Sequence, residues 1–183
     1  MIEREAALPQ LQTFFASQEA SAAPVIADIL RLAVDVSNHY SNDSLQGSIA
    51  VSYGRRVVVT QTVSLNELTR DHVIELIDYD PIKNIMLVVG EQEPDQGAIL
   101  HWMVHHARDD IHISLLIHNL SEKQEKPSYH IIQEEISRDP LDRAKIVLKT
   151  LREKKAMIIP EYGLFITGMT QQDITQQITS KKR

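Results

Sequence analysis

Hydrophobic residues in this 183-residue chain change their spacing several times, from the three- and four-residue steps of a helix to the short runs of a strand. Helical spacing is clearest in SAAPVIADILRLAVDVSNHYS (21–41), where an early proline precedes one apolar face. Two β-branched runs follow in QGSIAVSYGRRVVVTQT (46–62), and the glycine between them predicts a hairpin turn. A chain that alternates in this way is expected to form an α/β domain, with a sheet covered by helices.

The remaining segments continue the alternation. Helical spacing recurs in PDQGAILHWMVHHARDD (94–110), DPLDRAKIVLKTLREKK (139–155) and TQQDITQQIT (170–179). Further strands are predicted at HVIELIDYD (72–80), NIMLVVG (84–90), IHISLLIHN (111–119), AMIIP (156–160) and YGLFITG (162–168). Ser64 and Glu67 have the spacing of a capping box and predict one helical turn. The polar segment SEKQEKPSYH (121–130) is either a surface loop or a lid.

Composition limits the function classes. Apolar residues make up 43% of the chain, and neither a repeat nor a linker interrupts it, so we expect one domain over residues 1–183. The formal net charge of −6 argues against nucleic acid or an anionic membrane as a partner. Without cysteine, any metal would need histidine, aspartate or glutamate. The sequence has neither a secretory signal nor an apolar run of roughly 18 residues, and we expect a cytoplasmic protein.

Two charged clusters leave alternatives open. Glu91, Glu93 and Asp95 in GEQEPDQG form either a pair of acid/base carboxylates or a solvated acidic loop. Arg55 and Arg56 form either a handle for an anion or an exposed basic hairpin tip. The sequence contains no glycine-rich phosphate loop, nucleophile elbow or His-Glu-x-x-His pattern.

Three stretches together resemble the class II aldolase/adducin head domain family, to which the fuculose-phosphate and ribulose-phosphate enzymes belong. AMIIPEYGLFITGMTQQDI (156–174) is similar to the closing strands and helix of the family. PDQGAILHWMVHHARDDIHISLLIHNL (94–120) resembles its helix and metal-bearing strand, and LQGSIAVSYGRRVVVTQTVSLNELT (45–69) resembles its glycine-asparagine loop and hairpin. The resemblance is strongest over residues 25–178. It implies a three-layer α/β/α sandwich with a largely antiparallel central sheet.

The family holds a zinc-type divalent ion with a His-x-His pair and a later histidine, beside a glutamate acid/base and a phosphate pocket. A metal bound to the oxygens of an enediolate stabilises the charge left by carbon–carbon cleavage, while a carboxylate moves the proton. Transferred to this chain, the three metal positions fall on Leu116, His118 and Tyr162. Leucine has no lone pair, and a tyrosine with an ordinary pKa near 10 is a poor ligand at neutral pH.

The other family positions have also changed. The glutamate position falls on Gly97, which has no side chain to carry a proton, and the preceding phosphate positions fall on Asp95 and Gln96. Asp95 is expected to repel a phosphate. In the amino-terminal loop the glycine is kept as Gly47, while the asparagine is replaced by Ser48.

His118 therefore has two interpretations, either an inherited ligand or a structural residue that bonds a backbone carbonyl where SLLIHNL (114–120) ends. In the second, Tyr162 fills the former metal space and turns its hydroxyl toward His118. His101 and His105 share a helical face, and with His118 they are an alternative three-histidine metal site. Otherwise His101 makes a polar contact beside the core.

If the three histidines do not form a metal site, we expect His105, His106 and His112 to face solvent or a neighbouring subunit.

The sequence thus predicts a divergent family member without metal-dependent lyase activity, acting as a small-molecule-binding or assembly module. The alternative is a divergent aldolase or lyase that acts on a small sugar phosphate or hydroxy-carbonyl substrate through a rebuilt metal site. The candidate pocket residues are His118, Tyr162, His101, Asn119, Gly47 and Ser48. No cofactor is expected in the first case, and zinc or another divalent metal in the second. The resemblance also implies a homo-oligomer, specifically a tetramer.

Overall fold

The computed structural model describes residues 10–40, 44–120, 129–152 and 154–179. Its helices are α1 (Ile26–Tyr40), α2 (Gly97–Ala107), α3 (Pro140–Thr150) and α4 (Gln171–Thr179). Its strands are β1 (Gln12–Ser17), β2 (Gln46–Tyr53), β3 (Arg56–Thr60), β4 (Val63–Ser64), β5 (Val73–Asp80), β6 (Ile85–Val89), β7 (Ile113–Ile117), β8 (His130–Ile131), β9 (Ala156–Ile159) and β10 (Gly163–Gly168). Short 3₁₀ turns lie at Leu65–Glu67 and Arg70–His72.

The strands form one sheet in the order β1-β6-β5-β3-β2-β7-β10-β9-β8, with β4 beside β2. The inner pairs are antiparallel, but β1 runs parallel to β6, and β8 runs parallel to β9. The sheet is therefore mixed, and the prediction of a largely antiparallel sheet was wrong. The prediction failed at the two edges of the sheet, where β1 and β8 were not predicted as strands. A long crossover, rather than a hairpin, connects each of them to the strand with which it pairs, and such a connection allows parallel pairing.

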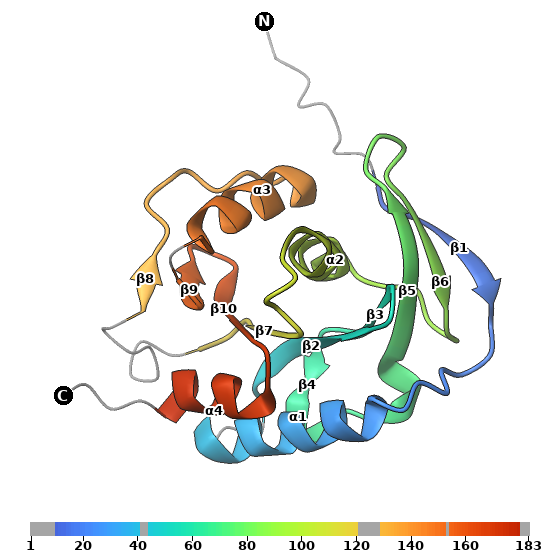
Figure 1. Ribbon diagram of the computed structural model, residues 1–183, viewed down its shortest axis with the longest axis horizontal. Coiled ribbons are helices and arrows are strands. Elements are labelled where there is room, and N and C mark those ends of the chain that lie inside the picture. The colour runs from blue at the N-terminus through green and yellow to red at the C-terminus, as the bar shows by residue number, and fades with distance from the viewer. Residues whose placement is uncertain (1–9, 41–43, 121–128, 153, 180–183) are drawn as a thin grey trace, which may run out of the picture.

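Helices cover both faces of the sheet, which curves around α2 (Figure 1). Residues of α1 and α4 share one core cluster with Leu115 and Ile117 of β7. Residues of α2 and α3 share another cluster with Leu116. Successive side chains of a strand point to opposite faces, so β7 contributes to both cores, and its even-numbered residues face α2. The more specific arrangement, a three-layer α/β/α sandwich, stays a prediction.

The helices and inner strands follow the local pattern of the sequence. In α1, the predicted apolar face is buried at Ile29, Leu32, Ala33 and Val36. The β2–β3 hairpin turns at Gly54, whose φ of 61° is easily reached without a Cβ. In the described part of the chain, none of the helices combines the length and apolar character that crossing a membrane requires.

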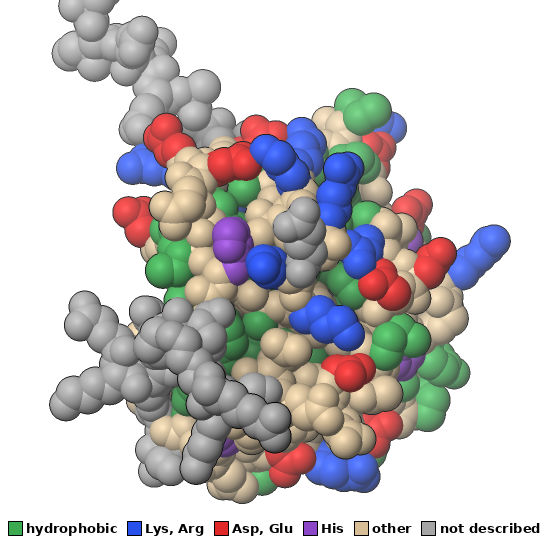
Figure 2. All heavy atoms as spheres, turned by 60° about the vertical axis from the view of Figure 1, so that its left-hand side comes forward, with side chains coloured by type: hydrophobic (Ala, Val, Ile, Leu, Met, Phe, Trp, Pro, Cys, Tyr) green, Lys and Arg blue, Asp and Glu red, His purple; other side chains and the backbone are tan. Residues whose placement is uncertain are grey.

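α3 begins as its sequence predicts and presents a charged outer face. The side chain of Asp139 accepts hydrogen bonds from the backbone N–H groups of Leu141 and Asp142, with Pro140 at the first turn. Lys149 pairs with Glu134 at 2.6 Å. Figure 2 shows basic and acidic side chains mixed over this side of the molecule, so a single charge does not dominate it.

The structure changes one local prediction and leaves another untested. Ser64 precedes the predicted turn at Leu65–Glu67, but its side chain makes no capping hydrogen bond. A capping box forms instead between Thr69 and His72. Of the polar segment 121–130, residues 121–128 lie outside the described part of the chain, so its role as a lid stays a prediction.

Candidate functional site

His118 follows β7 and is held on both its backbone and its ring. Its backbone N–H donates to the carbonyl of Gln46 at 2.9 Å, and its ring Nδ1 donates to the carbonyl of Tyr162 at 2.8 Å. This is the backbone-carbonyl contact expected of a structural histidine. Because a carbonyl only accepts, Nδ1 carries the proton in the neutral ring, and Nε2 has a lone pair. Nε2 is buried and has no hydrogen-bond partner among the described residues.

Tyr162 is fixed against His118 by an unusual backbone. Its N–H donates to the carbonyl of Ile159 at 3.0 Å, closing a turn before β10. Glu161 has a φ of 61°, a left-handed conformation that costs a residue with a Cβ about 1 kcal/mol. Gly163 follows with a φ of 143°, and a Cβ there would lie 2.1 Å from the carbonyl oxygen of Ile117. Only glycine allows this loop to approach β7 so closely.

The side chain of Tyr162 lies between His118, α2 and α3. Its ring meets the His118 ring edge to face, with centroids 5.2 Å apart. The guanidinium of Arg143 lies over the same ring, 4.0 Å from its centroid, at the distance of a cation–π contact. The hydroxyl reaches the start of α2, where a Cβ on Gly97 would lie 3.7 Å from it. The prediction that this hydroxyl bonds His118 was wrong, because Nδ1 bonds a carbonyl and Nε2 bonds nothing described.

Burial raises the pKa of the Tyr162 hydroxyl, and the nearby carboxylate of Asp95 raises it further, while Arg143 opposes both. The phenol therefore stays protonated and uncharged at neutral pH. In that state it fills space beside His118 without supplying the anionic oxygen that a metal would require.

Asp95 accepts from two backbone donors, one at the start of α2 and one between β3 and β4. One carboxylate oxygen accepts from the N–H of Gly97 at 2.8 Å, and the other accepts from the N–H of Thr62 at 2.7 Å. A helix N-terminus attracts negative charge, and here the chain supplies its own carboxylate. Glu91 and Glu93 are exposed and Asp95 bonds backbone N–H groups, which agrees with the interpretation of a solvated acidic loop.

A buried chain of hydrogen bonds runs from β2 through α2 and β7 back to β2. The Oγ of Ser48 lies 2.9 Å from His101 Nε2, and His101 Nδ1 lies 2.6 Å from Ser114 Oγ. The Oγ of Ser114 lies 2.8 Å from His105 Nε2, and His105 Nδ1 lies 2.6 Å from Ser52 Oγ. His101 thus makes the polar contact beside the core that the sequence predicted.

The prediction that His105 faces solvent or another subunit was wrong, since it is only 8% exposed. The curved sheet encloses α2 on most sides, so the helix lacks the single solvent-facing stripe that amphipathic spacing assumes. Burial lowers the pKa of both His101 and His105 to about 3, and neighbouring histidines add to the effect. His106 is exposed and stacks on Trp102 with ring centroids 3.6 Å apart.

Gly47 and Asn119 join the ends of β2 and β7. A Cβ on Gly47 would lie 2.6 Å from the carbonyl oxygen of Leu116, so glycine permits this close strand contact. The side chain of Asn119 accepts from the N–H of Gln46 at 2.8 Å and donates to the carbonyl of Ser44 at 3.0 Å. Both residues position His118 through the backbone of the two strands.

The donor set does not fit the divalent ion that the family resemblance implies. Leu116 is fully buried in the apolar core, and Tyr162 offers a protonated phenol. In the alternative set, all four ring nitrogens of His101 and His105 already have hydrogen-bonded partners. Within the described ranges, no group of three or more histidine, aspartate or glutamate side chains could hold a metal ion.

A depression of about 390 Å³ opens beside His118 and Tyr162. Its polar lining includes His118, Asn119 and Glu161, and its apolar lining includes Ile158 and Leu164. The volume and mixed lining suit a small molecule rather than an extended polymer.

Comparison with solved structures shows that the chain has the class II aldolase fold. It matches an L-fuculose 1-phosphate aldolase with a TM-score of 0.67 and 13% identity, over 87% of this chain and 82% of that chain. It matches the L-fuculose-1-phosphate aldolase of Thermus thermophilus with a TM-score of 0.62 and 14% identity, over 85% and 88%. A sugar-phosphate aldolase of Thermotoga maritima gives a TM-score of 0.60 and 13% identity, over 84% and 88%. At these identities the likeness establishes the fold alone.

No family model matches the sequence, and a search of curated proteins finds no match.

Two residues at the site were not predicted. Ser114 is a lone polar residue within an otherwise apolar strand, and such a residue signals a buried hydrogen-bond partner. Arg143 lies in the first turns of α3, and its sequence context gave no signal, because its contact with Tyr162 depends on how α3 packs.

Proposed function

We propose that this class II aldolase-fold protein binds a small molecule beside His118 and Tyr162 and does not catalyse metal-dependent carbon–carbon cleavage. The carrying observation is the placement of the Tyr162 ring, edge to face with His118 and with its hydroxyl directed at Gly97. A bulky neutral side chain lies beside the metal-ligand position, and the glutamate position has no side chain. The carboxylate of Asp95 supports the same proposal, because it occupies backbone donors that could otherwise bind a phosphate.

The polar atoms of the depression define the ligand that it could hold. The lone pair of His118 Nε2 is buried, so a ligand hydroxyl or amine can donate to it only after a neighbouring side chain moves aside. The carboxylate of Glu161 can accept another, while Ile158 and Leu164 contact carbon. A small hydroxylated or amine-bearing molecule with an apolar portion matches this lining.

The second candidate is a divergent lyase. It is favoured by the same unpartnered Nε2, since a buried imidazole lone pair can also accept a proton from a substrate. The structural relatives named above include aldolases of L-fuculose 1-phosphate and of sugar phosphates, which makes these compounds the substrates to test.

Metal content separates the two candidates. Purified protein, with and without added zinc, is expected to contain far less than one ion per chain by mass spectrometry, because only His118 remains as a donor. It is also expected not to cleave L-fuculose 1-phosphate. His118→Ala should leave the metal content unchanged, as should His130→Ala, a control at an exposed histidine on β8. About one ion per chain, lost in His118→Ala but kept in His130→Ala, would contradict the proposal and favour the lyase.

We further propose that the chain assembles into a homo-oligomer, specifically a tetramer, as the family resemblance implies. Light scattering should then give a mass near four times the 20.8 kDa of one chain. A monomer at all concentrations would remove the assembly part of the proposal, and ligand binding would have to be explained within one subunit.

A further inference from the structure

The buried chain of hydrogen bonds that ends at Ser48 and Ser52 has two proton orders in which every bond points the same way along the chain. Its two histidines are neutral, so each ring has one N–H donor and one lone pair. In the outward order, Ser48 donates to His101 and His101 donates to Ser114. The same direction continues from Ser114 through His105 to Ser52. In the inward order every bond is reversed.

The two orders differ in the tautomer of both rings at once. In the outward order, Nδ1 carries the proton in His101 and in His105, and Nε2 accepts. In the inward order, Nε2 carries the proton in both. Ser114 favours agreement between the two rings. Its single proton can be donated to only one ring, and if both rings donated to its oxygen, its own buried O–H would have no acceptor in the chain. If the tautomers differ, either one ring lone pair or the Ser114 O–H is left without a partner within the hydrogen-bonded chain, and leaving a buried polar group unpaired costs free energy.

Ser48 and Ser52, the two ends of the chain of hydrogen bonds, lie in different surroundings. Ser48 is 1% exposed and lies opposite Leu116 in the sheet, outside the lining of the candidate pocket. Ser52 is half-buried and lines a separate depression of about 430 Å³ between the β2–β3 turn and α2. In the outward order Ser52 accepts from His105, so its own proton is available to the depression. In the inward order the available proton belongs to Ser48.

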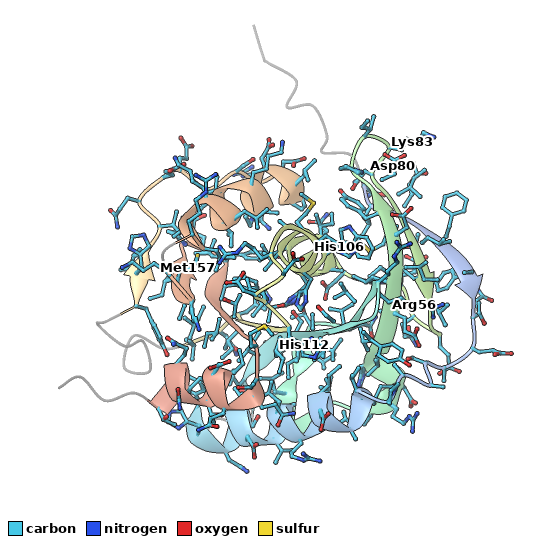
Figure 3. The ribbon with its side chains drawn as sticks, in the orientation of Figure 1. Arg56, Asp80, Lys83, His106, His112 and Met157 are labelled. Atoms are coloured by element: carbon cyan, nitrogen blue, oxygen red, sulfur yellow. The ribbon has the colours of Figure 1, made fainter. Side chains whose placement is uncertain are left out.

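The depression beside Ser52 presents a cation without a described partner. Arg55 follows the Gly54 turn, is exposed, and has no hydrogen bond or ion pair with any residue that the structure describes. Arg56 is half-exposed and uses Nη1 to bond Glu75 at 2.7 Å, which leaves other guanidinium donors. Arg56 from β3 and His106 from α2 line the same depression (Figure 3).

Two carboxylates, those of Asp78 and Asp109, also line this depression. Their charge weakens the attraction for an anion, so the occupant must gain from directed hydrogen bonds as well as from charge. Ser52 and Arg55 supply such donors, and an oxygen of a phosphate or carboxylate accepts from both.

We propose that the depression beside Ser52 and Arg55 binds a small oxyanion, and that the buried chain transmits this binding to Ser48 by adopting the outward proton order. Ser48 then directs its proton to His101 and offers only lone pairs to its other neighbours. Neither the oxyanion site nor the coupled tautomers depend on the function proposed for the depression at His118.

The test is ¹⁵N NMR of histidine-labelled protein at pH 7, which reports the tautomer of each ring. Inorganic phosphate, added at constant ionic strength, should increase the ratio of Nδ1–H to Nε2–H in His101 and His105 together. One net hydrogen bond at Ser52 corresponds to a change of about fivefold. Opposite tautomers in the two rings, or the same ratio with and without phosphate, would overturn the proposal.

Matched variants separate specific binding from general salt effects. Arg55→Gln should abolish the phosphate response. Asp109→Asn removes a repulsive charge and should tighten phosphate binding about threefold. Lys83→Gln, on the β5–β6 turn (Figure 3), removes another exposed cation and should change nothing. A response that survives Arg55→Gln, or that is lost in Lys83→Gln, would show that the depression is not the site. Failure of ligands to bind at His118 would affect the proposed function alone.

Discussion

Gly163→Ala is expected to destabilise the protein by about 4 kcal/mol, among the largest effects available to a single methyl group. The new Cβ would lie 2.1 Å from the carbonyl oxygen of Ile117 and 3.1 Å from the Cα of His118. Neither is a flexible side-chain end, so the backbone of β7 or of the Tyr162 loop has to move. The φ of 143° adds strain, since residues with a Cβ rarely adopt it.

The measurement is the free energy of unfolding from urea denaturation of Gly163→Ala and of Gly54→Ala. The control also has a positive φ, of 61°, but nothing lies within 4 Å of the point that its new Cβ would occupy. It should cost only about 1 kcal/mol. Similar losses in the two variants would mean that the close approach of the Tyr162 loop to β7 contributes little. The prediction further implies that Gly163→Ala displaces His118, which a shift of its ring resonances would reveal.

Acidification from pH 7 to pH 5 is expected to lower the free energy of unfolding by about 2 kcal/mol for each of His101 and His105. Their folded pKa of about 3 lies below the ordinary value of 6.5. Between these values the unfolded chain binds protons that the folded chain does not, so stability falls as pH falls. Above pH 6.5 both states are neutral, and this contribution to the pH dependence disappears.

Urea denaturation at half-unit steps between pH 7 and pH 5 tests this expectation. The slope near pH 5.5 should correspond to about two protons taken up on unfolding. His105→Gln should reduce that uptake by about one proton, whereas His130→Ala, at an exposed position, should leave the contribution of the buried pair intact. A flat profile in the wild type, or an NMR pKa near 6 for His101 in the folded protein, would contradict the burial argument.

The local sequence pattern was sufficient to predict the elements that have clear apolar spacing or a clear turn residue. The spacing of Ile29, Leu32 and Val36 predicted α1, and the glycine between two β-branched runs predicted the β2–β3 hairpin. The local sequence pattern did not predict β1 or β8. β1 is an edge strand whose residues alternate only between exposed and half-buried, and β8 spans only His130–Ile131. Both are strands because a neighbour offers them hydrogen bonds, which depends on distant parts of the chain.

By itself, the sequence determined the order of the helices and of the longer inner strands. It also determined which side chains cannot bind a metal, since Leu116 and Gly97 lack the necessary atoms wherever they lie. Only the tertiary structure decided what surrounds His118. Its contact with Tyr162 spans 44 residues, and the contact of Ser48 with His101 spans 53. Side-chain spacing reports which face of an element is apolar, but the curvature of the sheet around α2 determines which polar groups that face meets. For this reason His105 became buried, while the turn at Glu161 and Gly163 placed Tyr162 beside His118.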